Sequence, residues 1–193
     1  MDGDSYAESV CNYIARRYSN RGIELYREVS LGKSIIGKNR RVDIFVLHRP
    51  TNRALALECK YQGSSGTTDE KIPYTIDDLR AMRMPACVVY GGDGFSEGVK
   101  HMLRACNMAA YCLPESDNPK DIVSTKELDH VLAMRFDWWD IVVKESQRFS
   151  AESSELMLPG FEVRPVIARK RRDAKPAAKA VTIPAPLPIA DET

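Results

Sequence analysis

The sequence predicts an α/β domain with a mixed central β-sheet of about five strands flanked by helices. Three observations predict this fold class. Apolar residues recur at helical spacing in some segments and alternate in others, giving the order αβββαβαβ followed by further helices. The first three strands are consecutive and form a meander, whereas the later strands return through helices. At 193 residues, the chain is long enough for one well-cored domain plus an appendage.

The N-terminal half of this domain is predicted to be one helix followed by three strands. Val10, Ile14 and Tyr18 recur every fourth residue, which predicts an amphipathic helix over residues 5–19 with its cap near Asp4 or Ser5. The next apolar segments are short, and turn residues separate them. They predict strands at about 23–30, 41–48 and 54–61.

The C-terminal half is predicted to alternate helices with short buried strands. Thr75 followed by Asp78 resembles a capping box and predicts that a helix begins there. Residues 91–94, GGDG, lack the spacing of a nucleotide-binding loop and predict a turn in which Asp93 or Ser96 caps the next helix. The other predicted elements are strands at 86–90 and 108–113 and helices at 95–106, 124–134 and 137–148.

The composition changes after this domain, which we predict to span residues 1–148. Residues 149–193 lose the periodic pattern and become rich in Pro and Ala, which predicts a flexible tail. Between residues 164 and 179 the tail holds seven basic residues and one acidic residue. Such a tail either holds DNA through nonspecific phosphate contacts or serves as a solubilising extension.

The composition also limits the cellular location and the kinds of partner that are expected. The formal net charge is only +1, so any preference for a polyanion must be local. The five cysteines form no CxxC pair and no secretory leader opens the chain, which favours a reducing, cytoplasmic location. The three histidines are not spaced for a structural zinc site. No apolar run approaches the length of a membrane helix, so no membrane partner is expected.

The second and third strands are predicted to form a hairpin that carries the chemistry. If the four residues Arg49-Pro50-Thr51-Asn52 form the turn, His48 pairs with Arg53. The same register sets Asp43 opposite Glu58, with both side chains on one face of the sheet. The period of two then adds Lys60 and Gln62 to that face.

Two opposed carboxylates need a physical reason, because like charges in this arrangement destabilise a sheet. A Mg²⁺ ion supplies one, since its preferred ligands are hard oxygens and it retains room for water and a phosphate. Lys60 would orient and help deprotonate an attacking water or stabilise charge on a phosphoryl oxygen. The alternative is that Asp43 and Glu58 are solvated strand ends and that Lys60 pairs with one of them.

These residues resemble the motif of the PD-(D/E)xK, or restriction-endonuclease-like, nuclease superfamily. Val42-Asp43 stands where the family has Pro-Asp, and Glu58-Cys59-Lys60 stands where it has (D/E)xK. The resemblance covers about residues 5–113. It implies a restriction-endonuclease-like core in which Asp43 and Glu58 bind Mg²⁺, with Mn²⁺ expected to substitute, and Lys60 activates the water.

The resemblance implies roles for further residues. Glu8 looks like the helix glutamate that completes the metal shell in some branches of the family, directly or through water. Gln62 follows the lysine as it does in restriction-endonuclease-like proteins and is expected to assist nearby. Gly66, Thr67 and Lys71 occupy a similar downstream segment and are expected to bind the substrate; an ordinary connector is the alternative.

The function expected from this pattern is Mg²⁺-dependent DNA endonuclease activity. A homodimer is expected by analogy, because double-strand cleavage on this fold normally uses two active sites. A Holliday-junction-resolving or nicking nuclease is the alternative within the class. From another class, the alternative is a noncatalytic nucleic-acid-binding module, although such a module has no use for opposed carboxylates.

Overall fold

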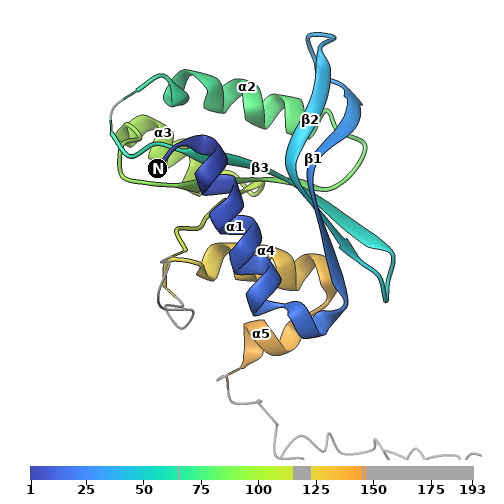
Figure 1. Cartoon of the computed structure of the whole chain (residues 1–193). Helices are drawn as coiled ribbons and strands as arrows, with labels where there is room; N and C mark the ends of the chain where they lie inside the picture. The colour runs from blue at the N-terminus through green and yellow to red at the C-terminus, as the bar shows by residue number, and fades with distance from the viewer. Residues whose placement is uncertain (65, 115–122, 145, 147–193) are drawn as a thin grey trace, which may run out of the picture. The chain divides into compact units, whose positions relative to one another are not determined.

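The predicted order of elements is present in the computed structural model, which describes residues 1–64, 66–114, 123–144 and 146. A helix comes first, three strands follow, and the remaining two strands alternate with helices (Figure 1). The elements are α1 (Gly3–Arg17), the 3₁₀ turn η1 (Ser19–Arg21), β1 (Ile23–Lys33), β2 (Asn39–His48), β3 (Arg53–Tyr61), α2 (Thr68–Arg80), β4 (Ala86–Gly91), α3 (Glu97–Ala105), β5 (Ala109–Tyr111), α4 (Lys126–Phe136) and α5 (Trp139–Val143).

The five strands form one mixed sheet in the order β1-β2-β3-β4-β5. The first three are antiparallel, and β3, β4 and β5 are parallel. This is the expected consequence of a meander followed by strands that return through helices. The predicted fold class, a mixed five-stranded sheet flanked by helices, is confirmed.

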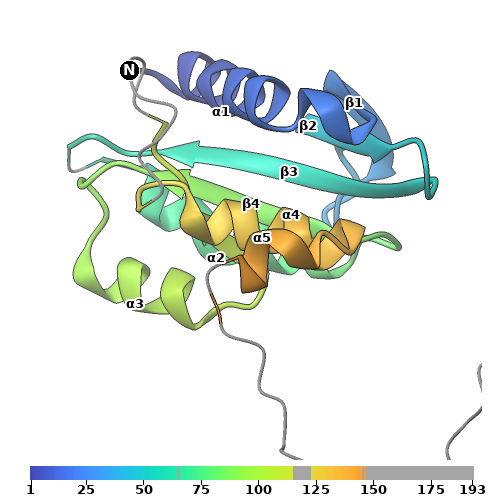
Figure 2. The ribbon, with the colours of Figure 1, turned by 90° about the horizontal axis from the view of Figure 1, so that it is seen from below.

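Helices cover both faces of the sheet, and each face has its own apolar cluster. Leu57, Cys59 and Val89 lie in the cluster that includes the buried residues of α1 and α4. Ala56 and Val88 lie in the cluster of α2 and α3. Figure 2 shows α1 and α3 on opposite sides of the sheet. Because side chains alternate along a strand, β3 divides its residues between these two layers.

The prediction that a helix begins at Thr75 is wrong. Helix α2 begins at Thr68, and Thr75 is buried inside it. Pro73 lies inside the helix and lacks the N–H of a regular helix interior. Ile72 and Ile76 are both buried in the core on either side of that proline, so packing of one helical face extends the helix across it.

Two other helix starts are better defined by the structure. Asp2, rather than Asp4 or Ser5, caps α1, since its carboxylate accepts the Ser5 N–H at 2.8 Å. Of the two residues considered for the next cap, Ser96 caps α3 by accepting the Val99 N–H at 3.4 Å. The preceding Gly92 has φ +94°, a conformation that glycine adopts at little cost.

The predicted boundary at residue 148 and the tail at 149–193 lie outside the described residues and stay predictions. The last predicted helix, 137–148, corresponds to the shorter α5 within the described part of the chain. In that same part, no helix has the length and apolar character needed to cross a membrane. All five cysteines are free thiols.

Candidate active site

The β2–β3 hairpin has the register that its turn predicts, and it places Asp43 where the two strands separate. Pairing runs from His48 with Arg53 to Ile44 with Leu57 and ends there, one step before Asp43. The Asp43 Oδ2 atom then accepts the N–H of Cys59 at 2.6 Å. A carboxylate thus replaces the next carbonyl of the ladder, which holds Asp43 at the point of separation.

Glu58 and Lys60 follow Ala56 at alternate positions of β3, on the side of α2 and α3, and the charges of Lys60 and Asp43 both act on Glu58. The Lys60 Nζ atom donates to Glu58 Oε1 at 2.7 Å. The Lys60 side chain is only 19% exposed and the Glu58 side chain 21%, so the ion pair is largely shielded from water. The predicted Asp, Glu and Lys set is therefore gathered at the end of the β2–β3 ladder.

The electrostatics of the site favour a bound cation. Burial raises the pKa of the Asp43 carboxyl, against the lowering effects of the Cys59 N–H and of Lys60. Burial also raises the pKa of Glu58; Lys60 lowers it, and the negative charge of Asp43 raises it again. One ammonium therefore does not compensate two desolvated carboxylates, and a divalent cation would stabilise their ionised forms.

A third carboxylate, Glu28, lies beside this pair and was not singled out in the sequence. β1 pairs with β2 through Arg27–Ile44 and Val29–Val42, which leaves Glu28 facing Asp43 without a ladder pair. Its φ is +56°, uncommon for a residue with a side chain inside a strand. Glu28 raises the pKa of Asp43 by its charge.

Glu28 also has a partner of its own, because its Oε2 atom forms an ion pair with Arg41 Nε at 2.6 Å. The register of the β1–β2 hairpin is the only information that would have placed Glu28 here. The connection between those strands has no turn sequence as definite as Arg49-Pro50-Thr51-Asn52, so that register was not predictable.

Glu8 is not brought to the carboxylate pair by the described contacts. Tyr6, Val10 and Ile14 of α1 pack on the face of the sheet that holds Leu57, whereas Glu8 is exposed. Over residues 1–64, 66–114, 123–144 and 146, no three His, Cys, Asp or Glu side chains form a group able to hold a metal. Within this part of the chain, neither Glu8 nor Glu28 joins Asp43 and Glu58 in such a group, and the metal role expected for Glu8 stays a prediction.

Gln62 is buried, and its hydrogen bonds connect three segments of the chain. Its Nε2 atom donates to Asp69 Oδ1 at 3.0 Å and to the Gly94 carbonyl at 2.8 Å. Its own carbonyl accepts the Gly94 N–H at 2.8 Å. These bonds tie the end of β3 to α2 and to the turn after β4. A side-chain Cβ at Gly92 would lie 2.4 Å from the Gln62 carbonyl oxygen, so this approach requires glycine.

The predicted substrate-binding segment is partly helical. Gly66 and Thr67 precede α2, and Lys71 lies near its start; all three are exposed. Asp69 in the same turn accepts from Gln62 and from the Ser96 N–H at 3.0 Å. The segment is thus connected to the end of β3 through Asp69 and Gln62. Its contact with substrate stays a prediction.

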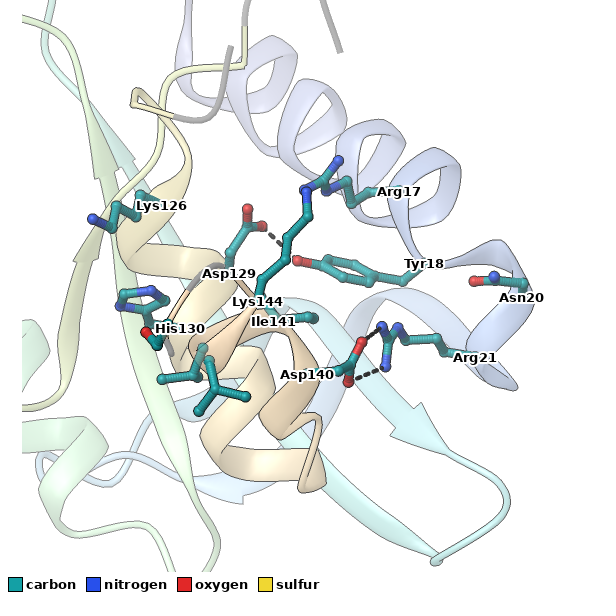
Figure 3. Close-up of a pocket in the computed structure, with 13 residues that line it drawn as sticks. Arg17, Tyr18, Asn20, Arg21, Lys126, Asp129, His130, Asp140, Ile141 and Lys144 are labelled. Carbon is teal, nitrogen blue, oxygen red and sulfur yellow. Dashed lines mark hydrogen bonds and ion pairs between the residues drawn. The ribbon is translucent and has the colours of Figure 1, made fainter. Parts of the chain in front are cut away.

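A cavity of about 820 Å³ lies apart from the candidate active site, where the end of α1 meets α4 and α5 (Figure 3). None of the predicted site residues lines it. The hydroxyls of Tyr13 and Tyr18 both donate to Asp129, at 2.7 and 2.6 Å, and Arg21 pairs with Asp140. These polar contacts join α1 and η1 to α4 and α5, and they give Asp129, Arg21 and Asp140 of the lining a structural role.

Comparison with known proteins places the chain in a family. A family model described as a PD-(D/E)XK nuclease superfamily domain matches residues 2–139. No curated protein matches. The similar solved structures include the protein of unknown function AF1548, with 16% identity, a TM-score of 0.36 and coverage of 51% of this chain and 53% of that one. They also include a repair endonuclease from Pyrococcus abyssi, with 16% identity, a TM-score of 0.33 and coverage of 56% and 46%. This chain thus spans about half the length of each. From the family match, the chain belongs to the PD-(D/E)XK nuclease superfamily.

Proposed function

We propose that the protein is a Mg²⁺-dependent endonuclease that hydrolyses phosphodiester bonds in DNA. The observation that carries the proposal is the grouping of Asp43, Glu58 and Lys60, two desolvated carboxylates and one ammonium, at the end of the β2–β3 ladder. This donor set fits a hard divalent cation with open coordination positions. Mn²⁺ is proposed to substitute for Mg²⁺.

The chain's own residues have separable tasks in this reaction. Asp43 and Glu58 would hold the cation, which when bound polarises the phosphate and acidifies water. Lys60, held by Glu58 at 2.7 Å, would orient the attacking water and offset negative charge on the phosphoryl oxygens. Gln62 would act indirectly, by holding the end of β3 against α2 through Asp69.

The proposal extends to the partners and the setting of the enzyme. Cleavage of both strands needs two such sites, so we propose a homodimer, which light scattering on the purified protein with and without DNA would test. We also propose a reducing intracellular location, with which the five free thiols agree.

Cleavage assays on three substrates test the function. The full chain would be incubated with supercoiled plasmid, linear duplex and a four-way junction, in Mg²⁺, Mn²⁺ or EDTA. We expect metal-dependent cleavage of the plasmid and the duplex, and a fall of at least about a hundredfold in Lys60→Ala. Lys100→Ala, which removes an ion pair with Glu97 on α3, is the matched control and should retain full activity.

The other results each have a meaning. Cleavage confined to the junction, or single-strand nicks alone, would favour the resolving or nicking alternative. Binding of DNA without cleavage in any metal would favour the noncatalytic module. Full activity of Lys60→Ala would refute the assigned mechanism.

A further inference from the structure

The far half of the β1–β2 hairpin, residues 30–41, is a locally basic segment, which we call the basic arm. Its sequence SLGKSIIGKNRR contains four cations and no acidic residue, in a chain whose formal net charge is only +1. Figure 1 shows the loop end of this hairpin rising beyond the end of α2. The charge of the arm is therefore a local feature of one projecting ribbon, and local positive charge is what attracts a polyanion.

The basic arm is held in place rather than loosely attached. Asp78 of α2 accepts the Ile35 N–H at 2.7 Å and pairs with the Arg40 guanidinium at 2.8 Å. Within the tip, the Ser34 N–H donates to the Lys38 carbonyl at 2.8 Å and the Gly37 N–H donates to the Ser34 carbonyl at 2.9 Å. The tip therefore has a defined position relative to the sheet.

Two isoleucines form the tip of the basic arm. Ile35 and Ile36 are 48% and 60% exposed, at turn positions where polar residues are usual. Lys33 and Lys38 flank them and are exposed. An apolar tip between cations matches the ribbons and wedges that enter a groove of duplex DNA, where cations contact phosphates and aliphatic groups contact bases.

The basic arm begins beside the candidate active site. Its two strands leave the sheet at Glu28 and Asp43, and Arg41 at its base pairs with Glu28. That ion pair is exposed, so it is weak and Arg41 can exchange Glu28 for a phosphate. The five strand steps from Glu28 to Lys33 span roughly 17 Å, about half of a DNA helical turn of roughly 34 Å.

We propose that the basic arm binds duplex DNA on one flank of the cleavage position, with Lys33, Lys38 and Arg41 on phosphates and Ile35 and Ile36 against base edges. This rests on the proposed nuclease function and names the contact that sets the duplex over the site. A second copy of the chain is a less suitable occupant of the tip, because two such arms in a symmetric contact would repel each other.

Binding measured without metal tests the basic arm separately from catalysis. The full chain would be titrated, in EDTA and at several salt concentrations, against a fluorescent duplex long enough to extend beyond both sides of a site. We expect the double variant Lys33→Ala/Lys38→Ala to bind about tenfold more weakly at physiological salt. Its slope of log affinity against log salt should fall by about two.

The double variant Ile35→Ser/Ile36→Ser separates the apolar contact from charge. It should bind several-fold more weakly with an unchanged salt slope, since no phosphate contact is removed. The matched control is Lys126→Ala/Lys144→Ala, which removes two exposed lysines from α4 and the end of α5 and should bind like the parent protein. Equal melting temperatures would show that each variant is folded.

The outcomes distinguish the arm from the enzyme. If the parent protein cleaves DNA and both arm variants bind DNA as it does, the arm proposal is overturned and the nuclease function stands. If the Ile35→Ser/Ile36→Ser variant changes oligomeric state but not DNA affinity, the tip is a subunit contact and the proposal is again overturned. A parent protein that neither binds nor cleaves DNA overturns both proposals.

Discussion

Asp43 combines a structural bond with the chemistry proposed for it. One oxygen accepts the Cys59 N–H at 2.6 Å, and a carboxylate has a second oxygen with which to ligate a cation. Burial raises its pKa, which means that folding disfavours the ionised form needed to bind metal. The residue is therefore placed at some cost in stability, as functional carboxylates often are.

Substitutions at Asp43 should separate these two roles. Asparagine keeps a carbonyl oxygen for the Cys59 N–H and removes the desolvated charge. We expect Asp43→Asn to melt at the same temperature as the parent protein or higher in EDTA at neutral pH, while metal-dependent cleavage falls by at least about a hundredfold. Asp43→Ala should lose the cleavage too, and also about 1–3 kcal/mol of unfolding free energy, because the Cys59 N–H is left unpaired.

Calorimetric titration with Mn²⁺ gives a reading independent of cleavage. The parent protein should bind the ion, and both Asp43 variants should bind it much more weakly. A lower melting temperature for Asp43→Asn than for Asp43→Ala would contradict the account of the hydrogen bond. Unchanged Mn²⁺ affinity in both variants would remove Asp43 from the metal site.

Prediction from sequence succeeded where a residue's place depended on a short local turn. The register of β2 and β3 followed from Arg49-Pro50-Thr51-Asn52, and it brought Asp43, Glu58 and Lys60 together. It failed for Glu28, whose place depends on the longer β1–β2 connection and on a φ of +56° that interrupts the strand's alternation. Counting alternate residues along the strand therefore could not place the Glu28 carboxylate next to Asp43.

At the scale of elements, the same contrast holds for helix α2. The helical spacing of Ile76 and Leu79 is visible in the sequence, but the capping-box pattern of Thr75 and Asp78 predicted a start seven residues after the observed one at Thr68. Burial of Ile72 outweighs the hydrogen bond that Pro73 cannot donate. The start of the helix is consequently next to Gln62, at the end of the strand that carries Glu58 and Lys60.

The contacts of Asp78 in α2 with Arg40 and Ile35 in the β1–β2 hairpin predict a contribution to stability that is lost in acid. Arg40 lowers the pKa of Asp78 below its usual 3.8, with the Ile35 N–H adding to the effect. A carboxyl whose folded pKa is lowered stabilises the fold above its unfolded pKa and loses that contribution as pH falls through the folded value. The contribution is therefore present at neutral pH and lost in acid below about pH 3.8.

Asp78→Asn should reveal this contribution in urea unfolding curves. We expect the variant to lose about 1–3 kcal/mol of unfolding free energy at neutral pH, since hydrogen bonds to a charged group are removed. The difference from the parent protein should shrink as the pH falls below about 4. Asp77→Asn, at the neighbouring exposed position, is the control and should change little. A difference that stays constant with pH would show that the Asp78 charge is not responsible.

At the scale of the whole chain, the described core accounts for the fold without the predicted tail. Over the part of the chain that the structure describes, both apolar clusters draw their buried members from residues 6–138. The family match likewise ends at residue 139. Stability of the nuclease domain should therefore reside in residues 1–148, and the basic tail should act, if at all, on the affinity for DNA.

Removal of residues 149–193 tests this division. We expect the shortened chain to unfold at the same temperature and with the same cooperativity as the full chain, because the sequence predicts a flexible tail and every described member of both clusters is kept. If the tail holds DNA, removal of its cations should also lower affinity and flatten the salt dependence, by about 0.9 in slope for each phosphate that the tail no longer neutralises. Alanine at Arg169, Lys170, Arg171 and Arg172 in the full chain is the matched variant, since it removes charge and leaves the length intact. Equal affinities for all three proteins would make the tail a solubilising extension. A lower melting temperature of the shortened chain would place the domain boundary beyond residue 148.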